Sequence, residues 1–340
     1  MKISIFGSGA WGIAIAILLN DNGHEVTLRS SHDDVTAMLR DTRRNPHLEN
    51  ITIPDTIRIA ETLDDATNGA EIAVMSTSSI ALRDIATKLK PKLAPDCVVV
   101  IVSKGIERGT SMLFTDILRD TFGPNRKIAA LSGPTHAEEV ARKIPTACVV
   151  ASTDADTARL VQDVFMSEYF RVYTSTDVIG VELGAALKNV IAVCAGICDG
   201  LGYGDNTIAT LATRGLSEIA RLSVAMGGRK ETLAGLAGLG DLIVTCTSRH
   251  SRNRRAGVLI GRGVPVREAM REVGAVVEGY YAAEAARDLA ARIGVDMPIC
   301  LEAYNVLYEG RDARDAIREL MGRSKRSEAF EDTLDESWVQ

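Results

Sequence analysis

A glycine-rich turn directly after the first apolar run constrains the fold of this chain more than any other feature. The run Lys2 to Phe6 leads into Gly7-Ser8-Gly9-Ala10-Trp11-Gly12, and an apolar pattern with helical spacing follows. This is GxGxxG between a strand and a helix. Gly7 permits the tight turn, Gly9 lets the backbone approach a pyrophosphate, and Gly12 allows the helix to pack closely on the sheet. The pattern predicts a site for the phosphates of a dinucleotide.

Two interpretations of this turn stay open at the level of the sequence. The helix N-terminus offers unpaired backbone N–H groups and a partial positive charge to phosphates. A glycine-rich connection can also serve turn geometry alone. In the same way, Trp11 either packs into the core or covers the pyrophosphate.

The pattern along the chain predicts an α/β fold with an N-terminal Rossmann-type doubly wound sheet, followed by an all-α C-terminal domain. We expect crossover helices at Ile80 to Leu89 and Ser111 to Thr121, and helices only after Thr174. The 340 residues favour two domains, which we place at 1–177 and 178–325, with a frayed tail at 326–340. Asp177 is the expected N-cap of the first helix beyond the boundary. Six apolar runs are expected to form the strands: Lys2 to Phe6, Glu25 to Leu28, Ile72 to Met75, Val98 to Val102, Ile128 to Leu131 and Ala147 to Ala151.

Composition excludes several classes of protein. A formal charge of -6 gives no basic field for nucleic acid or anionic membranes. No leader precedes the first strand run, so we expect a cytoplasmic protein. The most apolar stretch, Leu183 to Cys198, carries Lys188 and Asn189 and is too short for a membrane span, so we expect a buried helix. We expect no metal site and free thiols at the six cysteines, which show no CxxC spacing: Cys97, Cys148, Cys194, Cys198, Cys246 and Cys300.

The residues after the second strand bear on the choice of cofactor. An NAD-selective site usually has an acidic residue here for the ribose hydroxyls. This chain has Arg29, Ser30, Ser31 and His32 instead. Arg29 with two hydroxyls could receive a 2′-phosphate, which favours NADP(H). The alternative is that Arg29 is a solvated surface charge and Asp33 supplies the acid.

Lys188 lies within a run of apolar residues with helical spacing, where a lysine is unexpected. Burying an ammonium without a partner is costly or drives it neutral. One explanation without a functional role is that the ammonium reaches solvent or pairs with Glu182. Its functional explanation is proton transfer during redox chemistry, with burial and a second cation such as Lys104 lowering the pKa of Lys188. Asn189 follows and can hold a cofactor amide or substrate oxygen, or bond within its helix.

These motifs together resemble the NAD(P)-dependent glycerol-3-phosphate dehydrogenases over nearly the whole chain. The resemblance implies interconversion of dihydroxyacetone phosphate and sn-glycerol 3-phosphate with NADP(H) or NAD(H), in a homodimer that supplies glycerol 3-phosphate for glycerophospholipid synthesis. Besides the glycine turn, the matching blocks are Ser103-Lys104-Gly105, Leu131-Ser132-Gly133-Pro134-Thr135, Ala186-Leu187-Lys188-Asn189-Val190, Gly238-Leu239-Gly240-Asp241-Leu242 and Ser251-Arg252-Asn253.

The resemblance also implies roles for individual residues. It makes Lys188 the proton donor and acceptor, and the other catalytic residues Lys104, Asp241 and Thr245. It implies cofactor contacts at Gly7, Gly9, Ala10, Trp11, Gly12, Ser31, Lys104, Ala137, Arg252, Val276 and Glu278. It implies substrate contacts at Lys104, Gly133, Thr135, Lys188, Asn189, Asp241, Ser251, Arg252 and Asn253.

Chemistry supports some of these roles and leaves others open. The planar fork of Arg252 suits phosphate oxygens, although the four arginines between positions 249 and 255 could equally form a solvated basic loop. Asp241 could be a helix cap and Thr245 ordinary core. For Val276 and Glu278, the alternatives are core packing and a helix N-terminal acid.

The chain departs from the family pattern at three positions. Ala10 stands where many members have serine, which removes one phosphate hydrogen bond. His136 replaces the usual aromatic residue. Ser31 stands where a basic residue often meets the 2′-phosphate, which weakens the preference for NADP(H) without reversing it.

Two other classes of function compete with this prediction. Dehydrogenases of the 3-hydroxyacid or 6-phosphogluconate kind share a Rossmann domain and a helical lysine followed by asparagine. The Ser251-Arg252-Asn253 clamp argues against them. A regulator that binds NAD(P)H without turning it over would not need Lys188.

Overall fold

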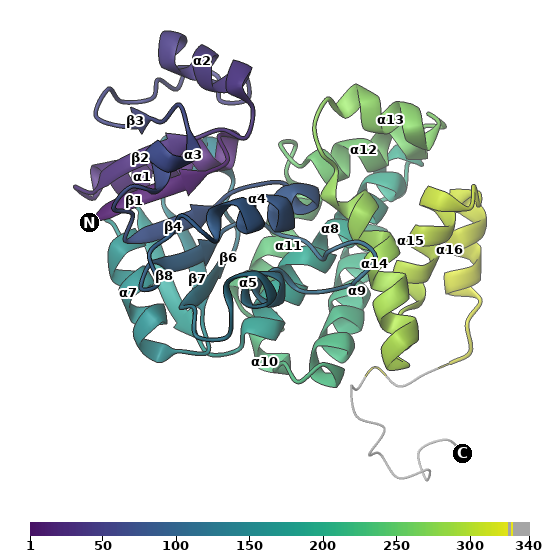
Figure 1. The fold of residues 1–340 in the computed structure, drawn as a ribbon. Coiled ribbons are helices and arrows are strands. Elements are labelled where there is room, and N and C mark those ends of the chain that lie inside the picture. The colour runs from purple at the N-terminus through teal and green to yellow at the C-terminus, as the bar shows by residue number, and fades with distance from the viewer. Residues whose placement is uncertain (326–327, 329–340) are drawn as a thin grey trace.

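In a computed structural model, which describes residues 1–325 and 328, the first half of the chain forms one eight-stranded sheet in the order β3-β2-β1-β4-β5-β6-β7-β8 (Figure 1). Neighbouring strands are parallel except β6 and β7, which are antiparallel. The strands are β1 Lys2–Phe6, β2 Glu25–Arg29, β3 Arg58–Ile59, β4 Ile72–Met75, β5 Val98–Ile101, β6 Ile128–Ser132, β7 Thr146–Ala151 and β8 Phe170–Ser175.

Helices cover the sheet and then form the second half of the chain. Those among the strands are α1 Ala10–Asp21, α2 Asp33–Thr42, α3 Leu63–Thr67, the 3₁₀ turn η1 Ser79–Ala81, α4 Leu82–Leu89, α5 Phe114–Phe122, α6 Ala137–Val140 and α7 Ala155–Phe165. Those that follow are α8 Val178–Gly200, α9 Asp205–Ala225, α10 Lys230–Leu233, the π turn η2 Leu236–Gly240, α11 Asp241–Thr247, α12 Arg252–Gly261, α13 Val266–Val273, α14 Glu278–Ile293, α15 Pro298–Tyr308 and α16 Ala313–Met321.

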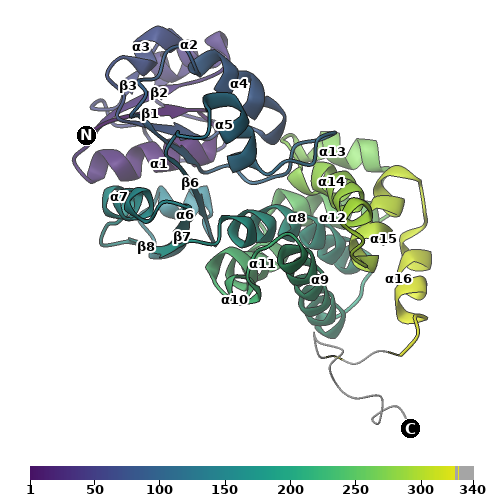
Figure 2. The ribbon, with the colours of Figure 1, turned by 60° about the horizontal axis from the view of Figure 1, so that its bottom comes forward.

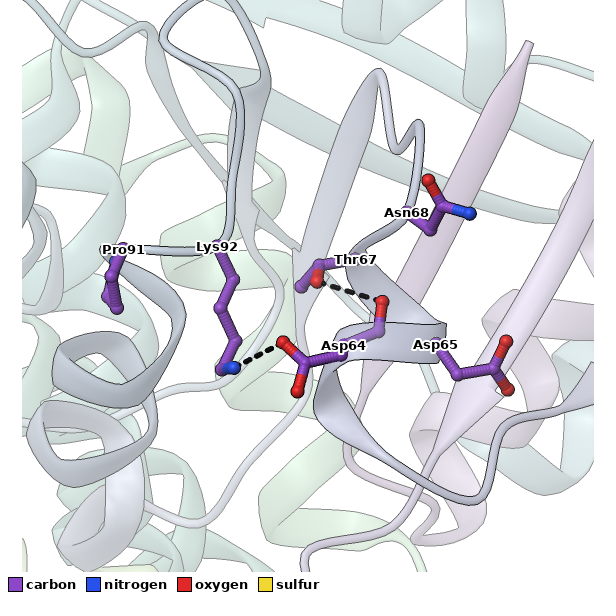
Figure 3. Close-up of a pocket in the computed structure, with 6 residues that line it drawn as sticks. All are labelled: Asp64, Asp65, Thr67, Asn68, Pro91 and Lys92. Carbon is purple, nitrogen blue, oxygen red and sulfur yellow. Dashed lines mark hydrogen bonds and ion pairs between the residues drawn. The ribbon is translucent and has the colours of Figure 1, made fainter.

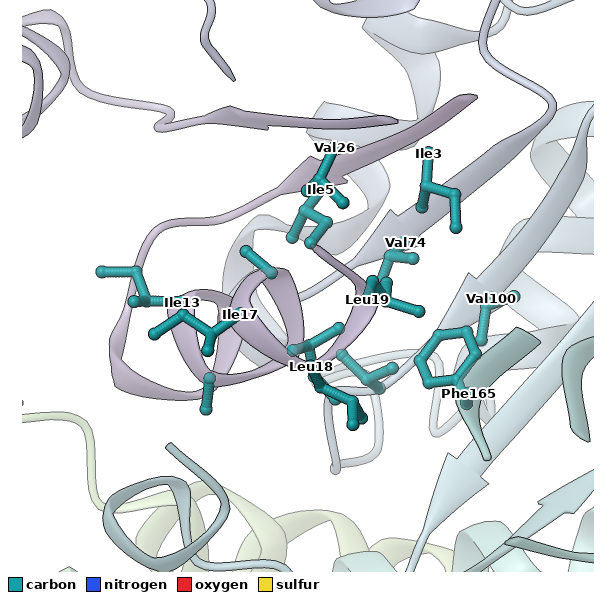
Figure 4. Close-up of a cluster of buried hydrophobic side chains, with 14 of the residues drawn as sticks. Ile3, Ile5, Ile13, Ile17, Leu18, Leu19, Val26, Val74, Val100 and Phe165 are labelled. Carbon is teal, nitrogen blue, oxygen red and sulfur yellow. The ribbon is translucent and has the colours of Figure 1, made fainter. Parts of the chain in front are cut away.

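The central strands are buried on both faces, which explains their near-continuous apolar sequences. Successive side chains of a strand point to opposite faces. Ile3 and Ile5 of β1 pack with α1 and with Phe165 of α7 on one face (Figure 4). Met75 of β4 packs with Phe114 of α5 on the other face. The predicted doubly wound sheet is therefore confirmed.

Two strands and one direction were absent from the sequence prediction. β3 has two residues, too few for an alternation to show. β8 alternates buried and exposed residues at the sheet edge, and its exposed Arg171 and Tyr173 weaken the apolar signal. The sequence predicts a mostly parallel sheet but gives no indication that β7 runs antiparallel to β6.

The helical half packs around α8, which is visible among the surrounding helices in Figure 2. Its 23 residues are long and apolar enough to cross a membrane. The expectation that this segment is too short for a membrane span, which was based on residues 183–198 alone, is therefore wrong. Of its most apolar window, 89% is buried within the protein. α8 is therefore the core helix of this half, as the sequence predicts.

The start of α8 is fixed by a side chain. Asp177 Oδ1 accepts a hydrogen bond from Gly180 N at 2.9 Å, and Asp177 Oδ2 accepts from Arg229 N at 2.8 Å and Thr232 Oγ1 at 2.6 Å. Asp177 is thus the N-cap of α8, as predicted, and also holds the segment leading into α10. The tail expected at 326–340 lies, apart from Glu328, outside the described residues.

Candidate active site

The candidate site lies at the carboxyl edge of the parallel strands. β1, β4, β5 and β6 run in the same direction, so the segments that follow them meet at one edge of the sheet. The glycine turn follows β1, Lys104 follows β5, and Gly133 follows β6. α8 and α11 approach this region from the helical half (Figure 1). Residues from both halves of the chain therefore contribute to the site.

The glycine turn has the geometry of a phosphate cradle. Gly7 has φ +115°, and a Cβ there would lie 2.2 Å from the Ser76 carbonyl oxygen. A Cβ on Gly12 would lie 2.0 Å from the Gly7 carbonyl oxygen, so α1 can pack this closely only on glycine. At Gly9, by contrast, a Cβ would meet no atom within 4 Å. The backbone at Gly9 is therefore open to a ligand.

The N-terminus of α1 is free to bind an anion. No side chain of the described residues 1–325 and 328 caps it, and its first turn contains no acidic residue. Backbone N–H groups in the first turn of a helix have no partner within the helix, and together with the helix dipole they attract phosphate. The turn itself is held in place by Asn45, whose Nδ2 donates to the Ser8 carbonyl oxygen at 2.9 Å.

Two lysines share one buried carboxylate. Lys188 Nζ donates to Asp241 Oδ1 at 2.6 Å, and Lys104 Nζ donates to Asp241 Oδ2 at 2.7 Å. Lys188 also donates to Thr245 Oγ1 at 2.5 Å, and Lys104 to the Gly133 carbonyl oxygen at 2.9 Å. The structure thus brings together four side chains, Lys104, Lys188, Asp241 and Thr245, from three segments that are far apart in the sequence. We call Lys104, Lys188 and Asp241 the two-lysine cluster.

This environment perturbs the ammonium of Lys188. Burial lowers the pKa of Lys188 to about 8, the Asp241 carboxylate opposes this shift, and the Lys104 charge adds to it. Because only 6% of Lys188 is exposed, it does not escape to water. It does not pair with Glu182 either, whose two oxygens accept from Thr115 N and Thr115 Oγ1. The structure therefore excludes both non-functional explanations of Lys188, exposure to solvent and pairing with Glu182.

Asp241 owes its position to a π turn. The turn η2, Leu236–Gly240, ends directly before Asp241, and wide turns of this kind occur frequently at functional sites. Asp241 begins α11, and Thr245 lies one turn later, where its Oγ1 donates to the Asp241 carbonyl oxygen at 2.6 Å. Asp241 caps no helix with its side chain, because both carboxylate oxygens accept from lysines.

A chain of amide contacts links α8, α12 and α14. Asn253 Nδ2 donates to Asn189 Oδ1 at 2.9 Å, and Asn253 Oδ1 accepts from Gly279 N at 2.9 Å. The helices α8 and α12 come this close because glycines face each other: a Cβ on Gly257 would lie 2.1 Å from the Val193 carbonyl oxygen. The start of α12 is therefore fixed beside the helix that carries Lys188.

Two of the four arginines around the start of α12, Arg252 and Arg254, have different roles. Ser251 caps α12, with its Oγ accepting from Arg254 N at 3.2 Å, and Arg254 pairs with Asp199 at 2.6 Å. Arg252 is exposed, and its charge acts on the carboxyl of Glu278 in α14. Its guanidinium shows no hydrogen bond or ion pair to the residues in the described part of the chain. Arg252 is therefore available to bind an anion, whereas Arg254 is structural.

Comparisons with known proteins identify the family. The family model described as the NAD-dependent glycerol-3-phosphate dehydrogenase N-terminus matches residues 2–158. The family model described as the NAD-dependent glycerol-3-phosphate dehydrogenase C-terminus matches residues 177–318. The chain belongs to the NAD-dependent glycerol-3-phosphate dehydrogenase family.

Individual members of the family cover almost the whole chain. A relative from Fusobacterium nucleatum named glycerol-3-phosphate dehydrogenase [NAD(P)+] is 48% identical over 330 residues, covering 96% of this chain and 98% of its own. One of the same name from Clostridium perfringens is 46% identical over 328 residues, covering 96% and 99%. The crystal structure of glycerol-3-phosphate dehydrogenase from Coxiella burnetii superimposes with a TM-score of 0.91 at 36% identity, covering 95% of this chain and 99% of the other.

Other residues that resemble the glycerol-3-phosphate dehydrogenase pattern lie around this centre. Glu278 begins α14 and is half-buried, and its Oε1 accepts a long hydrogen bond of 3.5 Å from Ser79 N. Thr135 Oγ1 donates to the same Gly133 carbonyl oxygen that Lys104 contacts, at 3.1 Å. Trp11 Nε1 donates to the Val102 carbonyl oxygen at 3.1 Å, which ties the glycine turn to the end of β5.

Three of the expected cofactor residues take no part in the hydrogen bonds of the two lysines. Ala137 is buried at the start of α6. Val276 lies half-buried just before α14, and Ser31 is exposed after β2.

The structure excludes one of the two alternatives that the sequence left open for Arg29, the solvated surface charge. It is buried, not solvated, with 8% of its surface exposed. Its guanidinium donates to Asp33 Oδ1 at 2.6 Å and to Thr36 Oγ1. The Asp33 side chain is 91% exposed, so the acid and the arginine form one pair at the surface. A 2′-phosphate would compete with Asp33 for Arg29.

A second hollow lies at the opposite edge of the sheet and is not part of this site. Figure 3 shows it between α3 and the segment after α4. α3 leads into the start of β4 and the α4 segment into the start of β5, so this is the amino edge of the strands. Its lining includes Asp64, Asp65 and Lys92, with Lys92 paired to Asp64.

In residues 1–325 and 328, no group of three or more His, Cys, Asp or Glu side chains could hold a metal ion.

Two residues near the lysines had no assigned role in the sequence analysis. Burial lowers the pKa of His136, and the charge of Lys188 adds to the effect. The ring of His136 lies 6.2 Å from that of His250, centroid to centroid. Glu182 lies six residues before Lys188 on α8 and is buried, with 7% of its surface exposed. A buried carboxyl within an apolar run, as in this helix, was the signal that could have identified Glu182.

Proposed function

We propose that the protein interconverts dihydroxyacetone phosphate and sn-glycerol 3-phosphate with NAD(P)H or NAD(P), and so supplies glycerol 3-phosphate for glycerophospholipid synthesis. The observation that carries this proposal is the buried Lys188, bound to a carboxylate that a second lysine shares. The relatives that share this fold over nearly their whole length are named for this reaction. The residues 1–177 would bind the cofactor, and 178–325 would bind the substrate.

The glycine turn fits the pyrophosphate of a dinucleotide. Gly9 leaves open space, and the uncapped start of α1 presents N–H groups and no carboxylate. Gly7, Ala10, Trp11 and Gly12 would complete this cradle. When bound, the nicotinamide cofactor supplies a hydride to the ketone carbon or takes one from the alcohol carbon.

Lys188 would supply the proton for reduction. A general acid works best when its pKa lies near the operating pH, and burial brings the pKa of Lys188 to about 8. In the reduction, Lys188 gives its proton to the carbonyl oxygen while the carbon receives the hydride, so the product is the alcohol. In the oxidation, neutral Lys188 takes the hydroxyl proton. Asp241 and Thr245 hold the Nζ atom in place for both directions.

Lys104 would act on the reacting oxygen through its charge. It lies on the opposite side of Asp241 from Lys188 and is fixed by the Gly133 carbonyl oxygen. A fixed positive charge in a site that excludes water stabilises the negative charge that develops on the oxygen during hydride transfer. Thr135 bonds the same carbonyl oxygen and would hold the loop closed over the substrate.

The start of α12 would bind the substrate phosphate. Arg252 is exposed and offers a planar fork of donors, and the adjacent Asn253 is fixed against Asn189 of α8. Ser251 would add its helix N-terminus to the same anion. This arrangement favours a phosphorylated substrate over the small 3-oxoacids of related dehydrogenases.

A direct assay tests this function. Purified protein is incubated with dihydroxyacetone phosphate or with a small 3-oxoacid, using NADPH and NADH side by side. We expect turnover of dihydroxyacetone phosphate with either cofactor. Exclusive use of the 3-oxoacid would refute the proposal, and binding of NADPH without turnover of any substrate would indicate a regulator.

We also propose that the protein is a cytoplasmic homodimer. The resemblance to the glycerol-3-phosphate dehydrogenases implies the dimer, and the burial of α8 inside the protein supports its role as a core helix and not as a membrane span. Sedimentation equilibrium should give twice the chain mass of 36.5 kDa. A mass of one chain would refute the dimer.

A further inference from the structure

A small cavity lies beside Lys104, on the side of this lysine that faces β6 and α8. Its volume is about 10 Å³, and the polar residues that line it are Ser103, Lys104, Ser132 and Glu182. Ser103 already donates its hydroxyl to the Thr77 carbonyl oxygen at 2.5 Å. One water molecule needs about 10 to 15 Å³ of such space and two to four polar partners. The cavity therefore has room for a single water.

Three polar groups at this cavity have unused hydrogen-bonding capacity. Ser132 Oγ is buried and has no partner among the residues that the structure describes. An ammonium has three donors. Lys104 uses two of them within the described chain, on Asp241 and on the Gly133 carbonyl oxygen. Each oxygen of Glu182 accepts one hydrogen bond from Thr115, which leaves further lone pairs.

We propose that this cavity holds one water molecule, which accepts from Lys104 and donates to Ser132 and Glu182, and that Glu182 is thereby a positioning residue for Lys104. The inference rests on the catalytic roles proposed above for Lys104 and Lys188. Buried waters typically make about three hydrogen bonds to groups that otherwise lack a partner, which is the number available here. Lys104 is then held from three sides, by Asp241, by the loop after β6 and by α8.

Glu182 also alters the charge balance of the two-lysine cluster. Asp241 alone supplies one negative charge to two ammonium groups. Burial raises the pKa of Glu182 to about 7, and the hydrogen bonds from Thr115 oppose this rise. Above that pH, Glu182 adds a second negative charge at the cavity that Lys104 also lines. Below it, Glu182 is neutral and the cluster keeps an excess positive charge.

The groups facing this arrangement come from several elements. Around Glu182, the charges of α5 are Asp116 and Arg119, which act in opposite directions on its carboxyl. Lys104 faces Asp241, and its charge also acts on Lys188, on His136 of the loop before α6 and on the buried thiol of Cys148 in β7. Cys148 stays protonated, because burial raises its pKa well above the ordinary value. Of these groups, Glu182 has its pKa raised to about 7 and Lys188 has its pKa lowered to about 8, while burial lowers the pKa of His136.

Glu182→Gln tests the proposal, and Glu218→Gln is its matched control. Glu218 is also a buried carboxyl whose pKa burial raises to about 7, and it also accepts two hydrogen bonds, from Ile299 N at 2.8 Å and Cys300 N at 3.2 Å. It lies on α9, and the cavity has no lining residue from that helix. Both variants therefore lose a buried carboxylate, but only Glu182→Gln changes a hydrogen-bond partner of the proposed water.

The pH profile of dihydroxyacetone phosphate reduction separates the two variants. Removing a negative charge from the cavity that Lys104 lines leaves the positive charge of the two-lysine cluster less balanced and makes the Lys188 cation less favourable, so in Glu182→Gln the basic limb of kcat moves to lower pH by about half a unit or more. In Glu218→Gln the basic limb of kcat should stay at the wild-type pH. In Ser132→Ala the basic limb should move to lower pH, but by a smaller amount than in Glu182→Gln. An unmoved limb in Glu182→Gln, or equal movement in both glutamine variants, would overturn the positioning role.

A crystal structure of the unliganded wild-type protein at high resolution tests the water independently of turnover. We expect one water within hydrogen-bond distance of Lys104 Nζ, Ser132 Oγ and a Glu182 oxygen. An empty cavity would overturn the proposal even if Glu182→Gln changed the profile. If the water is present but the wild type shows no basic limb, the proposed role of Lys188 fails instead.

Discussion

Replacing Asp241 by asparagine should shift the pH range of the reaction and not merely slow it. Asp241 Oδ1 lies 2.6 Å from Lys188 Nζ, and its charge raises the pKa of Lys188 against the effect of burial. Asparagine keeps the shape and one acceptor oxygen but removes the charge. The ammonium of Lys188 then loses its main stabilising partner, and its pKa falls below about 8.

The size of the shift follows from Coulomb's law. Two unit charges about 4 Å apart interact by about 4 kcal/mol at an effective dielectric constant of about 20. Since about 1.4 kcal/mol corresponds to one pKa unit, complete loss of this interaction would lower the pKa by about three units. The amide oxygen still accepts a hydrogen bond from Lys188, so we expect a fall of at least about one unit.

The assay follows both directions between pH 5.5 and 9.5 at saturating substrate. Reduction needs protonated Lys188, so its rate falls as pH rises through the pKa. Oxidation needs neutral Lys188, so its rate rises through the same pKa. In Asp241→Asn both limbs should move to lower pH. Asp199→Asn, which breaks the Arg254 ion pair, is the control and should leave both limbs in place. A uniform loss of rate without movement would refute the assigned role of Asp241.

Three other perturbations probe the binding residues. Arg252→Ala should raise KM for dihydroxyacetone phosphate by a factor on the order of 10 to 100, because a charged hydrogen bond to bound substrate is lost, and a change confined to cofactor affinity would contradict this. Gly9→Val should weaken NADPH binding with little change in Tm, whereas Gly12→Val should lower Tm, because only the second side chain would clash with the protein; similar melting curves would count against the cradle. Asp33→Ala should lower KM for NADPH but not for NADH, because it frees the Arg29 guanidinium for a 2′-phosphate. Equal effects on both cofactors would exclude Arg29 from that contact.

The sequence predicts those parts of the fold that rest on local patterns. The strand, turn and helix at residues 2–21 were recognised because glycine spacing and apolar periodicity are local signals. The cap of α8 by Asp177 was recognised for the same reason. The two-residue strand β3 and the direction of β7 depend on tertiary pairing, so no local signal exists for them.

The sequence predicts which residues could form the site but not how those residues lie relative to one another. Lys188 stood out because an ammonium within an apolar helix needs a reason. That its partner is Asp241 and not Glu182 depends on how η2 and α11 pack against α8, which periodicity cannot show. In the same way, the sequence of Arg29 and Asp33 permits either a phosphate-binding arginine or a ribose-binding acid, and the fold joins them in one ion pair.

Lys188→Met provides the most direct test of the central claim, that the buried ammonium of Lys188 supplies the proton in dihydroxyacetone phosphate reduction. The measurement is kcat with dihydroxyacetone phosphate and NADPH at pH 7, together with the Kd of NADPH from its fluorescence. We predict that kcat falls by a factor on the order of 100 or more, as expected for the loss of a general acid, while the Kd of NADPH changes little. Turnover close to that of the wild type would contradict the account.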